Sequence, residues 1–340
     1  MINIVRKTTS VKKPIIIAEI SGNHKGNKNR FLKLIKSAIF SGADLVKIQT
    51  YEPKDITLNK KSHHFKVKKG IWKNQTLWNL YQKAHTPFAW HQAAFKIAHR
   101  YKGKIFSSPF SIRSVDLLEK LKCPIYKIAS FEITDYKLID YIASKKKPII
   151  LSTGMSTITE VKNAVKIINK YHNKISILHC VSNYPTNIFD TDLSRIQYLK
   201  KKFPKNKIGL SDHTNGISSS ILASQMGVEY IEKHYNMDSV KTADSSFSIS
   251  PFQLNELKET INHLFNKKRK VKSIKINNLF LRRSIYATKI IKKNEKITYK
   301  NIDTFRPKIG ICASKYFKVL NKKTKKQILI GQPIFEKMLF

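Results

Sequence analysis

The sequence predicts an α/β fold, a (β/α)8 barrel followed by a small β-rich C-terminal domain. Short apolar runs rich in Ile and Val recur along the chain, and each precedes a polar cluster and a stretch with helical periodicity. Such alternation is typical of parallel strands, and eight units in about 230 residues match a barrel. The eight runs are Ile15–Glu19, Asp44–Gln49, Lys104–Ser107, Ile125–Ala129, Pro148–Ser152, Ser176–His179, Lys207–Ser211 and Tyr230–His234.

Helix start signals lie between these runs. Thr157 and Glu160 have the spacing of a capping box ahead of a helix at Val161–Ile168. Pro87 is expected at the first position of a helix that contains Trp90–Ala98. These signals support the assignment of helices between strands.

The 340 residues divide into a barrel domain and a smaller unit. We expect the barrel at residues 1–265, an exposed linker at 266–278 and a β-rich domain at 279–340. The linker begins with the basic run Lys267–Lys270, and the last segment has short apolar runs and little helical periodicity. About 60 residues is near the lower limit for independent folding.

The chain carries 65 Lys and Arg against 22 Asp and Glu, a formal charge of +43. One interpretation is a basic protein that binds nucleic acid or an anionic surface through its tail. However, only nine of the basic residues are Arg, and the lysines are scattered instead of forming a stripe of Arg and aromatic residues. We therefore favour a lysine-rich solvated surface and expect no nucleic-acid partner.

Composition also constrains the compartment. No run approaches the length of a membrane span, and Met1–Arg6 lacks the apolar stretch of a signal peptide. The three cysteines are too far apart for a metal knuckle and are odd in number. We expect a cytoplasmic protein without a membrane partner.

Polar side chains gather where the predicted strands end. In a barrel, these ends converge on one mouth, where such folds place their chemistry. At any one strand end, a polar residue could simply terminate the strand. This explanation does not account for polar residues at all eight strand ends. The set comprises Glu19, Lys47, Gln49, Ser107, Ser108, Lys127, Ser130, Ser152, Ser182, Ser211, Asp212, His213, Glu232 and His234.

Two kinds of site are suggested by this set. His213 and His234 end neighbouring strands and can bind a divalent metal with positions left open for water and substrate. The lysines and hydroxyls suit a phosphate or carboxylate. The sequence has no phosphate-binding loop, dinucleotide fingerprint or nucleophile elbow. Metal-polarised carbonyl chemistry with a phosphorylated anionic partner remains.

The segment 52–103 is longer than an ordinary strand–helix connection. It contains Trp72, Trp78, Tyr81 and Trp90. One interpretation is a lid or substrate wall over the mouth, and the other is an extra helix whose aromatic residues pack against the barrel. The sequence does not decide between them.

The strand-end motifs resemble those of the sialic acid synthase family, which joins phosphoenolpyruvate to an N-acetylated sugar aldehyde. The resemblance covers nearly the whole chain, and residues 279–340 are similar to the family's antifreeze-like SAF domain. The motifs are Ala18–His24, Gly42–Thr50, Lys127–Ser130, Leu151–Met155, Gly209–Thr214, Ile231–His234, Arg282–Tyr286 and Phe305–Pro307.

Within the family the chain most resembles the pseudaminic acid synthases, whose acceptor is 2,4-diacetamido-2,4,6-trideoxy-L-altrose. N-acetylneuraminate and legionaminate synthases, which share the core motifs, are the alternatives. The segments that carry this likeness are Gln49–Pro53, Leu77–Tyr81, Ala84–His91, Phe106–Phe110, Ala129–Ile133 and Ala243–Ser248.

The resemblance implies a role for each matching position. It implies that a divalent metal, Mn2+, is bound by His213 and His234. It implies that phosphoenolpyruvate is held by Lys47, Gln49, Lys127, Ser130, Ser152, Ser182 and Ser211. It implies that the sugar is oriented by Glu19, Glu132, Tyr184 and Asp244. Catalytic roles fall to Lys127, which offsets charge, and to Glu19 or Glu232 as the base, a choice that stays open.

The resemblance also implies a domain-swapped homodimer in which Arg306 reaches the sugar of the partner subunit. Two departures from the family pattern stand out. Ser182 occupies a position where these synthases carry Asn, and Lys308 follows Pro307 where a Gly is usual. The second departure affects the loop around Arg306 and leaves the Arg itself in place.

Overall fold

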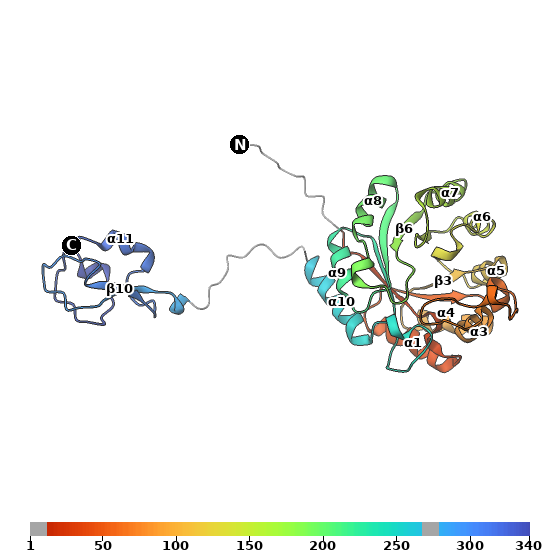
Figure 1. Ribbon diagram of the computed structural model, residues 1–340, viewed down its shortest axis with the longest axis horizontal. Helices are drawn as coiled ribbons and strands as arrows, with labels where there is room; N and C mark the ends of the chain where they lie inside the picture. The colour runs from red at the N-terminus through yellow and green to blue at the C-terminus, as the bar shows by residue number, and fades with distance from the viewer. Residues whose placement is uncertain (1–11, 267–278) are drawn as a thin grey trace. The chain divides into compact units, whose positions relative to one another are not determined.

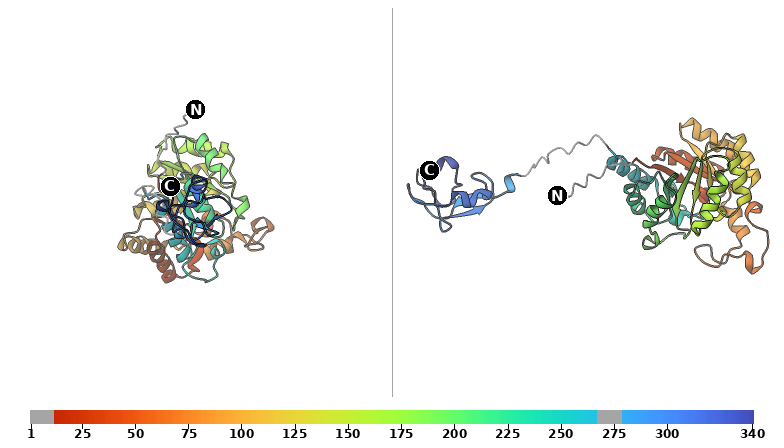
Figure 2. Two further views of the ribbon diagram at one scale, coloured as in Figure 1. Left: turned by 90° about the vertical axis from the view of Figure 1, so that its left-hand side faces the viewer. Right: turned by 90° about the horizontal axis from the view of Figure 1, so that it is seen from above.

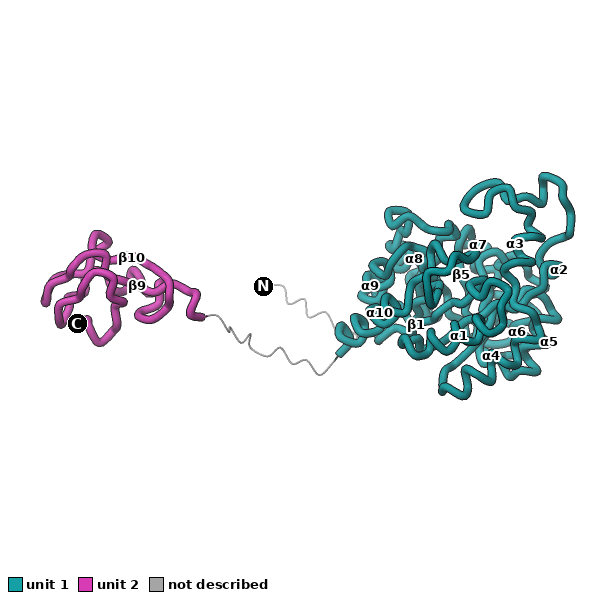
Figure 3. Tube along the Cα trace, turned by 90° about the horizontal axis from the view of Figure 1, so that it is seen from below, with its two compact units in different colours: residues 1–266 teal, residues 267–340 magenta. Residues whose placement is uncertain are grey.

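The computed structural model describes residues 12–266 and 279–340. The chain forms two compact units, residues 1–266 and 267–340, which Figure 3 colours separately. Each unit is described by itself. The segment Met1–Arg6 and all but the first residue of the expected linker lie outside the described residues.

The first unit is a closed barrel of eight parallel strands, as predicted. Each strand pairs with the next along the chain, and the first pairs with the last. Figure 1 shows the helices arranged around the strands. The strands are β1 (Ile15–Glu19), β2 (Leu45–Thr50), β3 (Ile105–Pro109), β4 (Tyr126–Ile128), β5 (Ile149–Ser152), β6 (Ile175–Cys180), β7 (Lys207–Asp212) and β8 (Tyr230–His234).

The helices of this unit follow the expected alternation. The Thr157–Glu160 capping box is confirmed at the start of α7, whereas Pro87 is the residue before the first turn of α4 and not its first residue. The helices are α1 (Lys28–Phe40), α2 (Pro53–Ile56), α3 (Leu77–Ala84), α4 (Phe88–Arg100), α5 (Ile112–Lys120), α6 (Tyr136–Ser144), α7 (Ile158–Ile168), α8 (Ser194–Lys202), α9 (Ser218–Gln225) and α10 (Pro251–Leu264).

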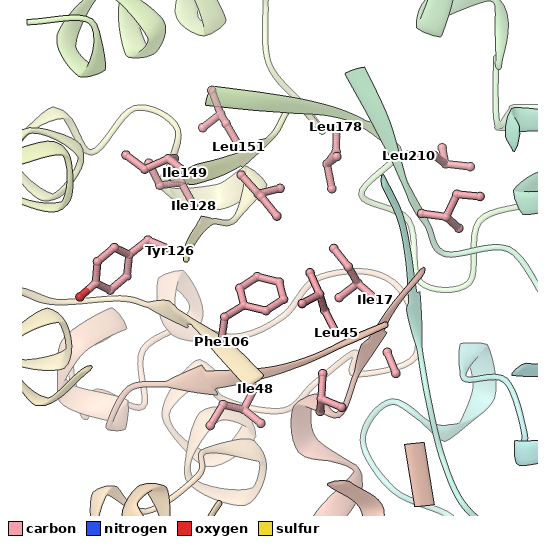
Figure 4. Close-up of a cluster of buried hydrophobic side chains, with 14 of the residues drawn as sticks. Ile17, Leu45, Ile48, Phe106, Tyr126, Ile128, Ile149, Leu151, Leu178 and Leu210 are labelled. Atoms are coloured by element: carbon pink, nitrogen blue, oxygen red, sulfur yellow. The ribbon is translucent and has the colours of Figure 1, made fainter. Parts of the chain in front are cut away.

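Strand alternation divides the side chains between the barrel interior and the surrounding helices. Figure 4 shows Phe106, Ile17 and Leu45 close together between the strands, while Tyr126 directs its hydroxyl away from them. That hydroxyl bonds to Glu119 on α5. Below the mouth, the barrel is therefore a packed core and not a channel.

The connection between β2 and β3 contains more than one helix. α4 packs beside α1 on the outside of the barrel, but residues 57–76 form an additional loop, orange in the right-hand view of Figure 2. Within this loop Lys66 pairs with Thr76 in an antiparallel bridge. Val67 donates to the Gln75 carbonyl, and Asn74 donates to that of Val67, both at 2.9 Å. We call residues 66–76 the hairpin.

The second unit is less regular than the predicted β-rich domain. Its named strands are β9 (Ser284–Ala287) and β10 (Ile302–Phe305), an antiparallel pair, and its short helix is α11 (Tyr316–Val319). The expected runs at 289–291 and 328–330 make only a single bridge, between Ile291 and Ile328. Turns with positive φ at Asn294 and Gly331 end these runs before a ladder can form.

Both units have an apolar core of their own. In the second unit, Ile285, Ile297, Ile302, Ile328 and Ile334 are each no more than 1% exposed. Across the described residues of both units, every helix is too short or too polar to cross a membrane.

Candidate active site

A cavity of about 720 Å³ opens at the carboxyl ends of the barrel strands. The predicted site residues of the first unit, Glu19 excepted, all line it. Glu19 lies just beneath, fully buried. Arg306 belongs to the second unit. The cavity-lining set is Lys47, Gln49, Lys127, Ser130, Glu132, Ser152, Ser182, Tyr184, Ser211, His213, Glu232, His234 and Asp244.

The floor of the cavity is a buried network of two lysines and two glutamates. Lys47 Nζ lies 2.8 Å from Glu19 Oε2 and 3.2 Å from Glu232 Oε1. Lys127 Nζ donates to both oxygens of Glu232, at 2.9 and 3.2 Å, and Ser211 Oγ donates to the same carboxylate at 3.2 Å. With all four groups ionised, their charges balance.

Burial and ion pairing shift the pKa values of these four groups in opposite directions. Burial raises the pKa of Glu232, but Lys127 and Lys47 outweigh it and hold that pKa well below its usual range. For Glu19 burial dominates over Lys47, so the pKa is raised. Burial lowers the pKa of Lys47, yet the two carboxylates raise it overall. Glu232 is therefore ionised and a poor proton acceptor.

Three serines and a glycine form a cradle beside this floor. Gly154 donates its N–H to Ser130 Oγ at 3.0 Å. A methyl group on Gly154 would lie 2.1 Å from Ser182 Oγ and 2.8 Å from Ser130 Oγ, so glycine is required for this close approach. The hydroxyls of Ser152 and Ser182 are buried without a hydrogen-bond partner. Such buried polar atoms are rare unless a ligand or water satisfies them.

The two histidines lie side by side on the wall formed by β7 and β8. Their ring centroids are 5.3 Å apart. His213 Nδ1 donates to the Val181 carbonyl at 2.8 Å, which leaves Nε2 free to ligate. His234 Nδ1 is buried without a partner, and burial together with neighbouring His213 and Lys47 holds the pKa of His234 well below its usual value.

These features fit a divalent metal, to which both imidazoles would bind in their neutral form. Within residues 12–266 and 279–340, no group of three or more His, Cys, Asp or Glu is arranged to hold a metal ion. A metal on this pair would therefore keep positions open for water or substrate, as catalytic sites do.

Glu132 stands on the far side of the cavity, in the short 3-10 helix Ser130–Glu132. Its Oε2 is buried without a partner. Burial is the main cause that raises the pKa of Glu132 to about 7. A carboxyl group with this pKa can give and take a proton near neutral pH.

Asp244 and Tyr184 complete the upper part of the cavity. Asp244 accepts from the Gly22 N–H at 3.0 Å, and burial raises its pKa. The Tyr184 ring lies 4.3 Å from the His213 ring, centroid to centroid. Of the predicted sugar-binding positions in the first unit, Glu132, Tyr184 and Asp244 thus line the same cavity as the two histidines, whereas Glu19 does not.

A model of the NeuB family matches residues 34–273 of this chain. The chain belongs to the NeuB family. It is 39% identical over 328 residues to the pseudaminic acid synthase of Helicobacter pylori, covering 94% of this chain and 96% of that protein. The pseudaminic acid synthase of Campylobacter jejuni serotype O:2 is 38% identical, with 95% and 96% covered.

More distant members of the family are matched as well. The N,N'-diacetyllegionaminic acid synthase of the same Campylobacter strain is 35% identical over 92% of this chain and 96% of that protein. The crystal structure of the N-acetylneuraminic acid synthetase of Leptospira borgpetersenii superposes with a TM-score of 0.68 at 29% identity, covering 79% of this chain and 90% of that one. The fold of the first unit is thus the NeuB barrel.

Two strand-end residues expected at the mouth of this NeuB barrel face away from it. Ser107 bonds to Thr50 at 2.6 Å, and Asp212 pairs with Lys233 at 3.2 Å, both nearly inaccessible. The cause is strand alternation, because residues next to inward-facing Ser108 or Ser211 must point outward.

The Asp212–Lys233 pair supports the histidines from behind. Asp212 also accepts from Thr214 N at 2.9 Å and Ser220 Oγ at 2.6 Å, and Lys233 donates to the Thr214 carbonyl. His213 lies between two residues held in this way, and His234 follows Lys233. Sequence analysis missed this support and Gly154, although both lie inside the motifs that carried the resemblance.

The long segment after β2 agrees in part with both interpretations, the substrate wall and the extra helix packed against the barrel. Trp72 and Tyr81 line the cavity, as a wall would. Trp90 instead packs on α1 and the turn before it, with ring centroids 5.9 Å from Phe31 and 5.5 Å from His24. The hairpin and α3 thus belong to the site, whereas α4 belongs to the barrel.

Proposed function

We propose that this NeuB-family chain is a pseudaminic acid synthase. It would condense phosphoenolpyruvate with 2,4-diacetamido-2,4,6-trideoxy-L-altrose and release phosphate. The observation that carries the proposal is the identity of 38–39% over nearly the full length to curated pseudaminic acid synthases. The 35% and 31% identities to legionaminic acid synthases make those the alternative.

The cavity supports a condensation of this class. It brings two buried lysines together with serine hydroxyls, two of which lack partners. Lys47, Lys127, Gln49 and the serines of the cradle would hold the phosphate and carboxylate of phosphoenolpyruvate. Ammonium groups fixed in a closed site stabilise developing charge by several kcal/mol.

A divalent metal, which we propose to be Mn2+, would sit on His213 and His234. When bound, it would supply a Lewis acid for the sugar aldehyde and lower the pKa of a water molecule. The free Nε2 of His213 and the unpartnered Nδ1 of His234 support this assignment.

The reaction requires a proton for the aldehyde oxygen. C3 of phosphoenolpyruvate forms a bond to the aldehyde carbon, water adds at C2, and the C2–O bond to phosphate breaks. Glu132 lines the cavity with an unpartnered oxygen and a pKa near 7, so we assign it the proton for the new hydroxyl. Glu232 is less suited because two lysines keep it ionised, and Glu19 lies beneath the cavity.

We also propose that residues 279–340 are the SAF domain of the family. In a domain-swapped homodimer, Arg306 would then reach the sugar bound by the partner subunit. The cytoplasm is the proposed location. Sedimentation of the full chain tests the dimer, and loss of activity in Arg306→Ala tests the Arg.

A panel of acceptor sugars tests the function. With Mn2+ and phosphoenolpyruvate, the purified chain should release phosphate with the diacetamido-trideoxy sugar, and the product mass should equal the sum of both substrates plus water minus phosphoric acid. Preference for N-acetylmannosamine would overturn the subtype. Absence of phosphate release with every sugar would overturn the synthase assignment.

A further inference from the structure

We propose that the hairpin and the start of α3 form an apolar specificity wall that selects a sugar whose end remote from the aldehyde carries methyl groups. The wall consists of Val67, Ile71, Trp72, Leu77 and Tyr81, all of which line the cavity. The proposal rests on the proposed function, because it places the aldehyde carbon at the histidines.

The wall is fixed in place by contacts with the rest of the site. Trp72 Nε1 donates to the Ala243 carbonyl at 3.1 Å, next to Asp244. The Trp72 ring centroid lies 5.6 Å from that of Tyr184, which in turn lies 4.3 Å from His213. Thus a single aromatic ring, that of Tyr184, lies between Trp72 and His213.

The chemistry of the wall differs from that of the floor. The floor offers ammonium, carboxylate and hydroxyl groups, whereas the wall offers aliphatic and aromatic surface. Ile71 is 46% exposed although it lines the cavity, so its side chain is available to a ligand. Lys69 is the one charged hairpin residue among those that line the cavity.

Part of the hairpin backbone is already hydrogen-bonded within the hairpin. Its ladder is closed internally by the bonds between Val67 and the segment Asn74–Gln75. A hydroxyl placed against the aliphatic side chains of Val67, Ile71 and Leu77 would find no polar side-chain partner there in exchange for its hydrogen bonds to water. A methyl group would lose nothing and would bury apolar area.

The proposed acceptor fits this contrast. It has a methyl group at C6 in place of the hydroxymethyl group of N-acetylmannosamine, and its second acetamido group adds another methyl. The wall would therefore discriminate at C6, remote from the aldehyde. An apolar pocket rejects a ligand that carries one added hydroxyl by about 100-fold.

The test compares kcat/KM for the 6-deoxy sugar with that for its 6-hydroxy analogue. Ile71→Ser places a hydroxyl on the wall at an exposed position, so it should leave the fold intact. We expect the preference for the 6-deoxy sugar to fall about 10-fold, with an unchanged KM for phosphoenolpyruvate. Trp72→Phe, which removes the bond to Ala243 but keeps a ring, should lower the same preference by a smaller factor.

Leu58→Ser is the matched control. Leu58 lies in the same loop and is 62% exposed, but it does not line the cavity. The preference of the Leu58→Ser variant for the 6-deoxy sugar should therefore equal that of the wild type. An unchanged preference in Ile71→Ser, with the wild type active on the diacetamido sugar, would overturn the wall and leave the proposed function standing. A wild type that neither binds nor converts that sugar would overturn both.

Discussion

Lys127 Nζ lies within 2.9 and 3.2 Å of the two carboxylate oxygens of Glu232, and neither side chain is more than 3% exposed. Because Lys47 contacts the same carboxylate, one acidic group serves two buried cations. Replacing Glu232 and replacing Lys127 should therefore affect the stability of the fold to different extents.

Glu232→Gln should destabilise the fold more than Lys127→Met. The first change leaves Lys127 buried without a counter-charge, which costs about 3–5 kcal/mol. After the second change Glu232 keeps Lys47 and loses its hydrogen bonds from Lys127, so we expect about 1.5–3 kcal/mol. Urea unfolding measures both. Lys147→Met, at a more exposed pair with Glu119, should cost about 1 kcal/mol or less. Equal losses in Glu232→Gln and Lys127→Met would contradict the shared carboxylate.

His213→Ala should abolish stabilisation by a divalent metal. A ligand at 100 times its dissociation constant stabilises a protein by about 2.7 kcal/mol, and the variant loses half of the proposed ligand pair. Thermal unfolding of chelator-treated protein with and without Mn2+ measures the difference. His64→Ala, in the exposed 3-10 helix His63–Phe65, should behave as the wild type. A full metal-induced shift in His213→Ala would exclude this histidine as a ligand.

Gly154→Ala should weaken phosphoenolpyruvate binding by about 10- to 100-fold, because small displacements in a site have effects of this size. The added methyl group would push Ser182 and Ser130 out of the cradle. Titration calorimetry measures the affinity. Gly103→Ala is the control, since its methyl group meets Ile39 at 2.4 Å outside the cavity. It should lower stability and leave the affinity unchanged, and a loss of affinity in Gly103→Ala alone would argue against the cradle.

Glu132→Gln should stabilise the protein at pH 8 but not at pH 4. Burial raises the pKa of Glu132 from its ordinary 4.5 to about 7 in the folded chain. The folded state thus binds more protons between these values, so its stability falls as the pH rises from 4.5 to about 7. The variant avoids that loss, which is at most about 3 kcal/mol and smaller for a partly exposed group. Unfolding curves that show no pH-dependent difference would contradict the raised pKa.

The barrel could be predicted because its strands are buried on both faces and must therefore be apolar on both. This requirement appears in the sequence as eight short apolar runs. Each strand end followed to within about two residues, and with it Lys47, Lys127, Glu232 and His234. The orientation of neighbouring residues was less certain. Ser107 and Asp212 were expected at the mouth, but β3 continues to Pro109 and β7 includes Asp212, so strand alternation turns both side chains outward.

Other features depend on contacts between residues far apart in the sequence. That Glu232 serves two lysines follows from side-chain geometry across the barrel, which no local pattern encodes. The need for Gly154 arises from serines on two other loops. The second unit holds its core with isolated bridges, and such irregular backbone has no period by which it could be recognised.

Trp72, which is held at the cavity by its hydrogen bond to the Ala243 carbonyl, is an intrinsic fluorescence probe of the site. The chain has three tryptophans, and Trp72 is the one that lines the cavity. Replacing Trp78 and Trp90 with Phe would leave a single indole at the site, whose emission depends on the polarity around it. Rapid-mixing fluorescence could then follow the arrival of each substrate in real time, without a label and before any chemistry occurs.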